Sequence, residues 1–166
     1  GLPLEKEEVE PSFIHYEKNL IPSLQNENFS LKLIAGEALG LKSPVKTSSP
    51  LIFAEVKAKN DSFLDLKDIK FEVALYVISG NVQVGEVLVS DRQMIVLDSE
   101  SLTQIKLLKN VHLVIIGGEP LEGPRHLYWN FISSRKDRIE IAKKEWKDRT
   151  FPMVPGETEF IPLPEK

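Results

Sequence analysis

Apolar and polar residues alternate along much of the middle of the chain, with the two-residue period of a β-strand. Leu31 and Leu33 flank Lys32, residues 51–58 form a short apolar run, and residues 71–78 give the strongest strand signal. Ser-Gly-Asn at 79–81 predicts a turn into a further strand at 82–84. Runs at 87–89, 94–97, 102–107 and 111–116 follow, separated by turn-forming residues. Many short strands at even spacing predict a β-sandwich or barrel, without choosing one sandwich type over another.

The last third of the chain changes period and predicts one C-terminal α-helix at about 134–148. Ile139, Ala142 and Trp146 recur at helical spacing and form an apolar stripe, which we expect to dock on the sandwich. Ser134 is the expected N-cap, with Asp137 in the capping-box position. Residues 1–28 show little periodicity and many charges and prolines, so they predict an extended linker or tail. The folded domain is predicted to span 29–166.

A run of motifs after Gly117 resembles the carboxy-terminal domain of the pirin family, which belongs to the cupin superfamily. The motifs are Gly118-Glu119-Pro120-Leu121, Gly123-Pro124-Arg125-His126, Trp129-Asn130-Phe131, the helix ending at Trp146, Pro155-Gly156-Glu157 and Phe160-Ile161-Pro162-Leu163-Pro164. The resemblance implies a mostly β protein: a cupin-type double-stranded β-helix, or jelly-roll sandwich, followed by one helix. The first 13 residues resemble the pirin segment that crosses from the first cupin domain to the second. We therefore expect the chain to be a fragment that lacks a metal-binding N-terminal cupin.

Composition and charge exclude several other classes of protein. The chain has 166 residues, 42% apolar and 28% charged, which fits one globular domain. A formal net charge of -4 gives no general reason to expect a nucleic-acid partner. The absence of cysteine excludes disulfides, thiolate metal ligands and cysteine nucleophiles. No apolar run has membrane-spanning length, so we expect no membrane partner and a cytoplasmic location.

The histidines do not form the pattern expected of a cupin metal site. Two ligands of such a site typically stand as His-x-His on one strand, because alternate side chains share a face. His15, His112 and His126 are the only histidines, and no two share a strand. Where the motif is expected, before Gly80, the chain has Asp68-Ile69-Lys70-Phe71-Glu72-Val73. We predict no catalytic residue, no metal and no cofactor in this chain; the resemblance places an iron-type metal in the missing N-terminal domain.

Four residues remain as candidate ligand or interface contacts: His112, Glu119, His126 and Trp129. His112 alternates with Val114 and Ile116 and is expected to point inward, more as a hydrogen-bonded structural histidine than as a ligand. Glu119 and His126 form a polar cluster near the mouth of the sandwich in one interpretation. In the other, they and Trp129 only pin the crossover from strand to helix. The acidic pairs Glu7-Glu8 and Glu157 with Glu159 are interpreted as solvated surface.

The preferred function is structural: a metal-free domain that packs against the N-terminal cupin. The alternatives are a part of a quercetin 2,3-dioxygenase-like oxygenase and a module that binds a small ligand or a protein. An inward polar residue such as His112 or Gln104 beside an open cavity favours ligand binding, whereas a filled apolar interior favours the structural role. If a first domain is missing, Leu2, Leu4, Phe13 and Ile14 lose their cover. The isolated chain then either forms a homodimer through this tail or leaves the tail mobile.

Overall fold

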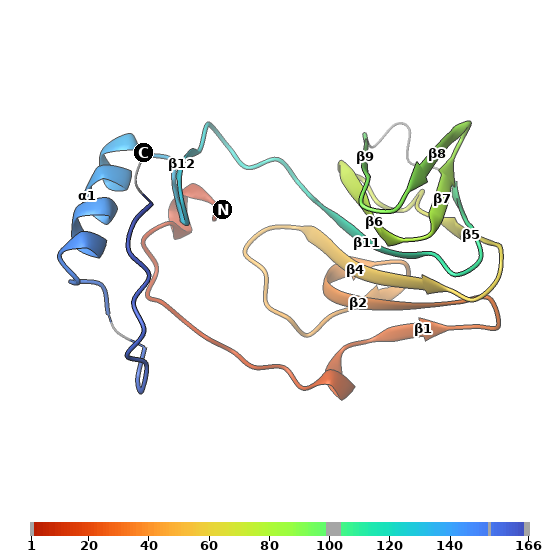
Figure 1. Cartoon of the computed structure of the whole chain (residues 1–166), viewed down its shortest axis with the longest axis horizontal. Helices are drawn as coiled ribbons and strands as arrows, with labels where there is room; N and C mark the ends of the chain where they lie inside the picture. Colours follow the sequence, from red (N-terminus) through yellow and green to blue (C-terminus); the bar gives the residue numbers. More distant parts are fainter. Residues whose placement is uncertain (1, 99–103, 153, 165–166) are drawn as a thin grey trace. The chain divides into compact units, whose positions relative to one another are not determined.

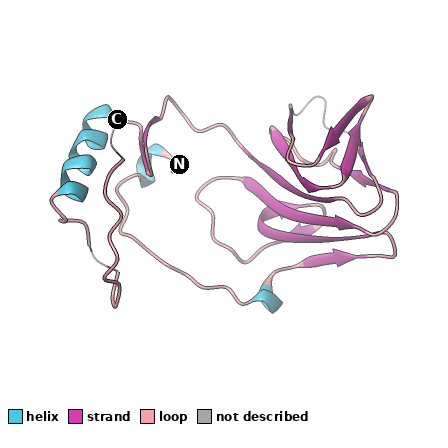
Figure 2. Cartoon of the chain, in the orientation of Figure 1, coloured by secondary structure: helices cyan, strands magenta, loops and turns pink. Residues whose placement is uncertain are grey.

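The computed structural model describes residues 2–98, 104–152 and 154–164, which form two compact units (Figure 1). The larger unit contains residues 11–120 and the smaller unit contains residues 1–10 together with 121–166. The first unit is built of strands, and the α-helix lies in the second (Figure 2). No helix in the described ranges has the length and apolar character needed to span a bilayer.

The larger unit consists of two antiparallel sheets. One sheet has the order β1 (Ser23–Gln25), β2 (Phe29–Ala38), β4 (Leu51–Ala58), β11 (His112–Gly118), β6 (Val73–Ser79) and β9 (Met94–Leu97), with β3 (Leu41–Lys42) paired to β2. The other has the order β5 (Ser62–Asp65), β10 (Gln104–Leu107), β7 (Asn81–Val84) and β8 (Val87–Ser90). A short 3-10 helix, η2 (Lys18–Leu20), precedes β1. The predicted β-sandwich is confirmed.

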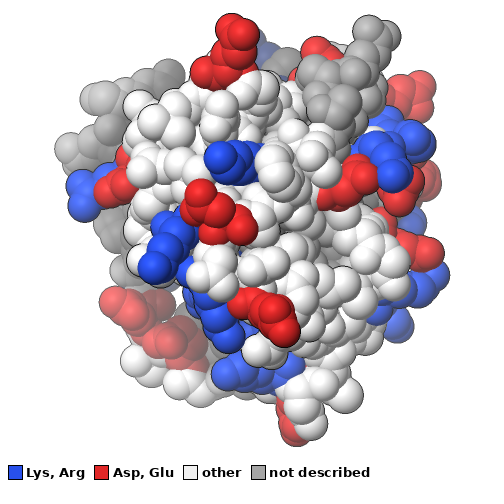
Figure 3. All heavy atoms as spheres, turned by 90° about the vertical axis from the view of Figure 1, so that its right-hand side faces the viewer, with Lys and Arg blue, Asp and Glu red and all other residues white. Residues whose placement is uncertain are grey.

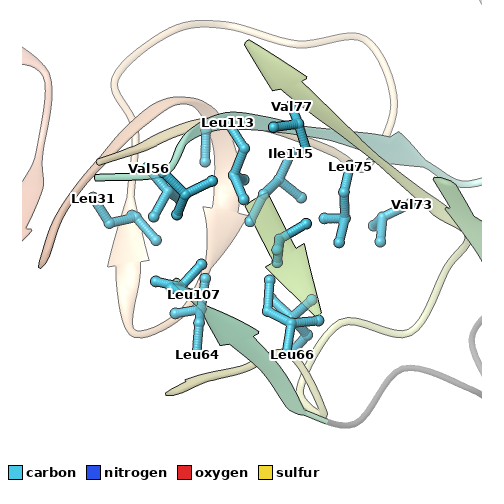
Figure 4. Packing of buried hydrophobic residues seen from close by; sticks show 14 of the residues in the cluster. Leu31, Val56, Leu64, Leu66, Val73, Leu75, Val77, Leu107, Leu113 and Ile115 are labelled. Carbon is cyan, nitrogen blue, oxygen red and sulfur yellow. The ribbon is translucent and has the colours of Figure 1, made fainter. Parts of the chain in front are cut away.

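The core lies between the two sheets because alternate residues of each strand face inward. In β4, Ile52, Ala54 and Val56 are fully buried, while their neighbours are more exposed. Side chains of β5 and β10, Leu64 and Leu107, meet those of the larger sheet in one cluster (Figure 4). The strand signals at 31–33 and 51–58 therefore contain inward-facing positions of this sandwich, whereas residues 102 and 103 of the predicted run at 102–107 lie outside the described residues.

A glycine allows β2 to remain paired with β4 through an irregular segment. Gly36 has a φ of +93°, and a Cβ at this position would clash with the backbone carbonyl of Leu51. The pairing of β2 with β4 also shifts between Leu33 and Ala35, which marks a β-bulge. Glycine thus lets the irregular strand stay against its neighbour as far as Ala38.

The smaller unit joins the two ends of the chain. It contains the 3-10 helix η1 (Leu4–Lys6), the hairpin β12 (His126–Tyr128) and β13 (Phe131–Ser133), and the helix α1 (Lys136–Lys147). Residues 1–10 thus group with the carboxy-terminal region, whereas residues 23–25 pair as β1 with β2. The predicted boundary between a linker at 1–28 and a domain at 29–166 stays a prediction.

The predicted cap of α1 is wrong. The N-cap residue is Arg135, without a side-chain capping bond, and the helix begins at Lys136. Ser134 is occupied elsewhere, because its hydroxyl donates a hydrogen bond to Glu7 Oε2 at 2.8 Å. Asp137 still provides an acidic group in the first helical turn, where the helix dipole favours it.

The apolar stripe of α1 packs within the smaller unit. Ile139 and Ala142 are buried, and α1 lies against β12 and β13. Trp146 contacts aromatic side chains of the hairpin and of the chain that follows the helix. The stripe was predicted to dock on the sandwich; its contacts in the structure are with this hairpin and with neighbouring rings.

Candidate functional site

His112 lies on the outer face of the larger sheet. Its β11 neighbours Leu113 and Ile115 are the buried positions, so His112 shares the outer face with Val114 and Ile116. The predicted inward orientation is wrong, because apolar partners two residues away fix the alternation but not which face is the core. The His112 Nε2 lies 2.9 Å from Glu55 Oε1, as expected of a structural, hydrogen-bonded histidine.

Glu55 is the centre of a small polar cluster on this outer face. Its carboxylate accepts contacts from Lys57 Nζ at 2.7 Å and from His112 at 2.9 Å. The hydrogen bond from Lys57 above all, with that from His112, lowers the pKa of the Glu55 carboxyl below its ordinary value. The result is a partly solvated cluster of Glu55, Lys57 and His112 on two neighbouring strands, rather than a catalytic group.

The interior of the sandwich is apolar among the residues that the structure describes. Every buried side chain described within residues 11–120 is apolar, and Leu33, Leu75 and Leu113 have no solvent exposure. Gln104, the other candidate for an inward polar residue, is exposed at the start of β10. The described core of the sandwich is therefore one cluster of apolar side chains from both sheets (Figure 4).

The residues present do not fit a mononuclear metal ion. In the ranges that the structure describes, no three His, Asp or Glu side chains come close enough to share one. His15 is exposed, His112 is bonded to Glu55, and His126 lies on β12 in the other unit. The three histidines are therefore dispersed in the part of the chain that the structure describes.

Glu119 and His126 belong to different units, so their predicted polar cluster stays a prediction. Glu119 is exposed, and its backbone N–H donates a hydrogen bond to the Pro50 carbonyl at 3.0 Å. His126 stands opposite Ser133 in the β12–β13 hairpin. Both interpretations of these two residues therefore stay predictions.

The sequence interpretation missed the role of Glu7. Its side chain is only 11% exposed, and it accepts hydrogen bonds from the Ser133 hydroxyl and from the Ser134 backbone and hydroxyl. Arg125 Nε lies 3.1 Å from Glu7 Oε1, and Arg125 also donates to the Leu2 carbonyl. These hydrogen bonds, first of all that from the Ser134 hydroxyl, lower the pKa of the Glu7 carboxyl. Glu7 is therefore not solvated surface, and no local signal marks it, because its partners are more than 100 residues away.

An aromatic pocket of about 330 Å³ lies beside α1 in the smaller unit. Trp146 is its centre: it makes edge contacts with Trp129 and Phe151 and stacks on Phe160, with centroids 5.2 to 5.6 Å apart. The Arg149 guanidinium lies 4.2 Å from the centre of the Phe160 ring. Aromatic walls with a few charged groups at the rim suit an apolar or planar group carrying hydrogen-bond acceptors.

Trp129 reaches this pocket from a strained position. It occupies the two-residue turn between β12 and β13 with a φ of +53°, a region that bulky side chains rarely adopt. Such strain persists only where the surroundings enforce it. Here the ring is fixed by edge contacts with Phe131 and Trp146. Of the predicted contact residues, Trp129 is the one that the structure brings into a pocket.

On the face shown in Figure 3, acidic and basic side chains are interspersed, with broad uncharged areas between them.

A comparison with known families identifies the chain. The profile of the family described as "Pirin C-terminal cupin domain" matches residues 53–152. The chain belongs to the pirin family. Among relatives of this pirin domain, the "Pirin-like protein" of Caulobacter vibrioides is 39% identical over 167 residues, which cover 99% of this chain and 58% of that protein. Human "Pirin" is 28% identical over 150 residues, covering 84% of this chain and 51% of its own length.

A solved structure shows the same fold. The quercetin 2,3-dioxygenase of Acinetobacter baumannii superimposes with a TM-score of 0.85 at 27% identity, over 99% of this pirin domain and 56% of that chain. The chain therefore spans about half the length of the relatives it matches. The predicted pirin membership and cupin sandwich with one helix are confirmed.

Proposed function

We propose that this chain is the structural, carboxy-terminal cupin domain of a two-domain pirin-like protein. It holds no metal of its own and packs against an N-terminal cupin that carries an iron-type metal. The observation that supports the proposal is the apolar interior of the sandwich, where no buried polar side chain occurs among the described residues. A domain built in this way contributes shape and surface rather than chemistry.

The larger sheet offers a surface for the second domain. Phe53 on β4, Ile116 on β11, Ala74 on β6 and Val96 on β9 are paired in register across four strands, and we name these four residues the outer apolar row. Phe53, Ile116 and Val96 are exposed although they are large and apolar. A contiguous apolar strip on a sheet is typical of a contact surface. Since the relatives are about twice as long as this chain, we assign this strip to their other domain.

Metal analysis tests the first half of the proposal. Elemental analysis of the purified chain should find no stoichiometric iron, copper, nickel or zinc, whereas the whole Caulobacter relative should hold a metal. About one tightly held metal ion per chain, lost on His112→Ala or His126→Ala, would overturn the metal-free assignment.

Binding tests the second half. The chain is mixed with a separately produced amino-terminal half of the Caulobacter relative, and complex formation is measured by light scattering. Ile116→Asp with Val96→Asp should abolish the complex, because charged groups in the strip lose solvation without gaining partners. Val87→Asp is the matched control, because Val87 is equally exposed but lies on β8 of the other sheet. Equal loss in both variants, or a homodimer through the strip, would contradict the assignment.

The second candidate function is that of the whole protein as a quercetin 2,3-dioxygenase-like oxygenase. The names of the Acinetobacter structure and of a Pseudomonas aeruginosa relative, "Putative quercetin 2,3-dioxygenase PA1205" at 28% identity, support it. On this proposal the present chain forms part of the wall of the active site, and the other domain performs the reaction. Oxygen uptake with quercetin should be absent for this chain alone and present for the two halves combined.

A further inference from the structure

The carboxy-terminal residues Phe160–Pro164 run beside α1 in the smaller unit, and we name this segment the strap. Pro162 and Pro164 fix φ near -65°, and each disfavours the helical region for the residue before it. Within the described part of the chain, the strap belongs to no helix or strand and forms no backbone–backbone hydrogen bond. Its composition therefore favours a polyproline II conformation, whose carbonyls are free to accept from side chains.

Two aromatic side chains donate hydrogen bonds to the strap backbone. Trp146 Nε1 donates to the Ile161 carbonyl at 2.9 Å, and the Tyr128 hydroxyl donates to the Pro164 carbonyl at 3.2 Å. The two carbonyls are three residues apart. Because polyproline II has three residues per turn, carbonyls at this spacing lie on the same side of the segment. The two donors thus contact one side of an extended segment that contains two prolines.

A ring contact fixes the register of the strap. Phe160 stacks on Trp146 with a centroid distance of 5.5 Å and an interplanar angle of 23°. The Arg149 guanidinium lies 4.2 Å from the centre of the same Phe160 ring. Tyr128 is itself covered by the Lys143 ammonium at 4.5 Å. An anchoring ring followed by two carbonyl contacts defines the order Phe-x-Pro-x-Pro.

We propose that Tyr128, Trp146 and Arg149 form a recognition site for a Phe-x-Pro-x-Pro segment in the polyproline II conformation, and that the strap of this chain is its resident ligand. Aromatic grooves that donate to carbonyls are a recurrent way of binding proline-rich segments. The contacts are those of a peptide held in a groove, because side chains supply them and no strand pairing joins the strap to a sheet. The site therefore accepts the same segment when it is supplied as a separate peptide.

The test uses the full chain with Phe160→Ala, Pro162→Ala and Pro164→Ala, which empties the site without touching it. The strap must first be displaced from the site, because a segment attached to the chain competes with the added peptide at an effective concentration on the order of millimolar. The probe is a synthetic peptide with the sequence of residues 158–164. We expect saturable binding that shifts the indole N–H resonance of Trp146. A peptide with alanine at both proline positions should bind more weakly, since it lacks the preformed conformation.

Substitutions in the site identify the two donors, with the affinity measured by calorimetry because Trp146→Phe lacks the indole. Trp146→Phe and Tyr128→Phe keep a ring but remove the donor, so each should weaken peptide binding by about 2- to 10-fold. Tyr76→Phe on β6 is the control, because it removes a hydroxyl from the other unit. Unchanged affinity in both donor variants, or equal binding of the alanine peptide, would overturn the proposal.

A second measurement uses the intact strap and does not depend on the triple variant being folded. In the otherwise unchanged chain, Tyr128→Phe and Trp146→Phe should speed proteolytic cleavage within 158–164 while Tyr76→Phe does not. Cleavage rates equal to that of the unchanged chain would overturn the assignment. A dimer that dissociates on Phe160→Ala would identify the strap of a second copy as the ligand, and would overturn the intramolecular part.

Discussion

The two units of this protein are stabilised in different ways. The sandwich of residues 11–120 buries aliphatic side chains between two sheets, and every buried residue described there is apolar. The smaller unit instead combines an aromatic cluster around Trp146 with the charged cluster around Glu7, and its buried Ser133 is polar. Burial of apolar area is nondirectional, whereas ring stacking and hydrogen bonds fix particular partners.

This difference means that the contacts which fix particular partner residues are concentrated in the smaller unit. The aliphatic core of a β-sandwich tolerates exchange of one aliphatic residue for another of similar volume. The smaller unit joins residues 1–10 to 121–166 through contacts that depend on a single carboxylate and on one indole. We therefore expect substitutions in the sandwich to lower global stability, and substitutions in the smaller unit to release particular segments.

The largest effect is expected for Leu113→Ala in the sandwich. Leu113 on β11 has no solvent exposure, so the substitution removes buried methyl groups and leaves a cavity. The free energy of unfolding should fall by about 2–5 kcal/mol. Urea denaturation measures the loss, and Ile116→Ala on the outer face is the control with an expected change below about 0.5 kcal/mol. Equal losses at Leu113 and Ile116 would mean that the outer face is covered as well.

A smaller and more local loss is expected for Trp146→Ala. The ring contacts Trp129, Phe131, Phe151 and Phe160, but it is only partly buried, so the expected cost is about 2–3 kcal/mol. Hydrogen exchange should show faster exchange in α1 and the hairpin while the sandwich stays protected. Trp146→Phe retains most of the ring area and should lose less. Uniformly faster exchange across both units would contradict their energetic independence.

The Glu7 cluster predicts a pH dependence of the smaller unit. Because its hydrogen bonds lower the pKa of Glu7 below 4.5, the carboxylate contributes fully above that pH. The contribution is lost as the pH falls through 4.5 toward the lowered pKa. Tryptophan fluorescence between pH 7 and pH 3 should follow this loss, and Glu7→Gln should reduce the pH dependence. Glu8→Gln is the matched control, because Glu8 is exposed; a profile equal to that of Glu7→Gln would remove the special role of Glu7.

Local periodicity predicted the longer strands of the sandwich and the helix, because inward positions such as Ile52, Ala54 and Val56 repeat every two residues. It did not predict the short strands β1, β3, β5, β12 and β13. Periodicity did not fix which face is the core, so the orientation of His112 was wrong. The helix cap failed for another reason: Ser134 bonds to Glu7, far away in the sequence. The strap motif was visible as Phe160 to Pro164, but its two donors, Tyr128 and Trp146, are brought together only by folding.

The smallest effect is expected on the outer face of the sandwich, at Glu55. Its ion pair with Lys57 and its contact with His112 are partly exposed, and solvent screens such pairs. Glu55→Gln should therefore change the free energy of unfolding by less than about 1 kcal/mol. Urea denaturation in low and high salt measures the change, and the difference between variants should shrink as salt is added. A loss as large as that of Leu113→Ala would show that this cluster is covered and structurally essential, and that the outer face is a second core.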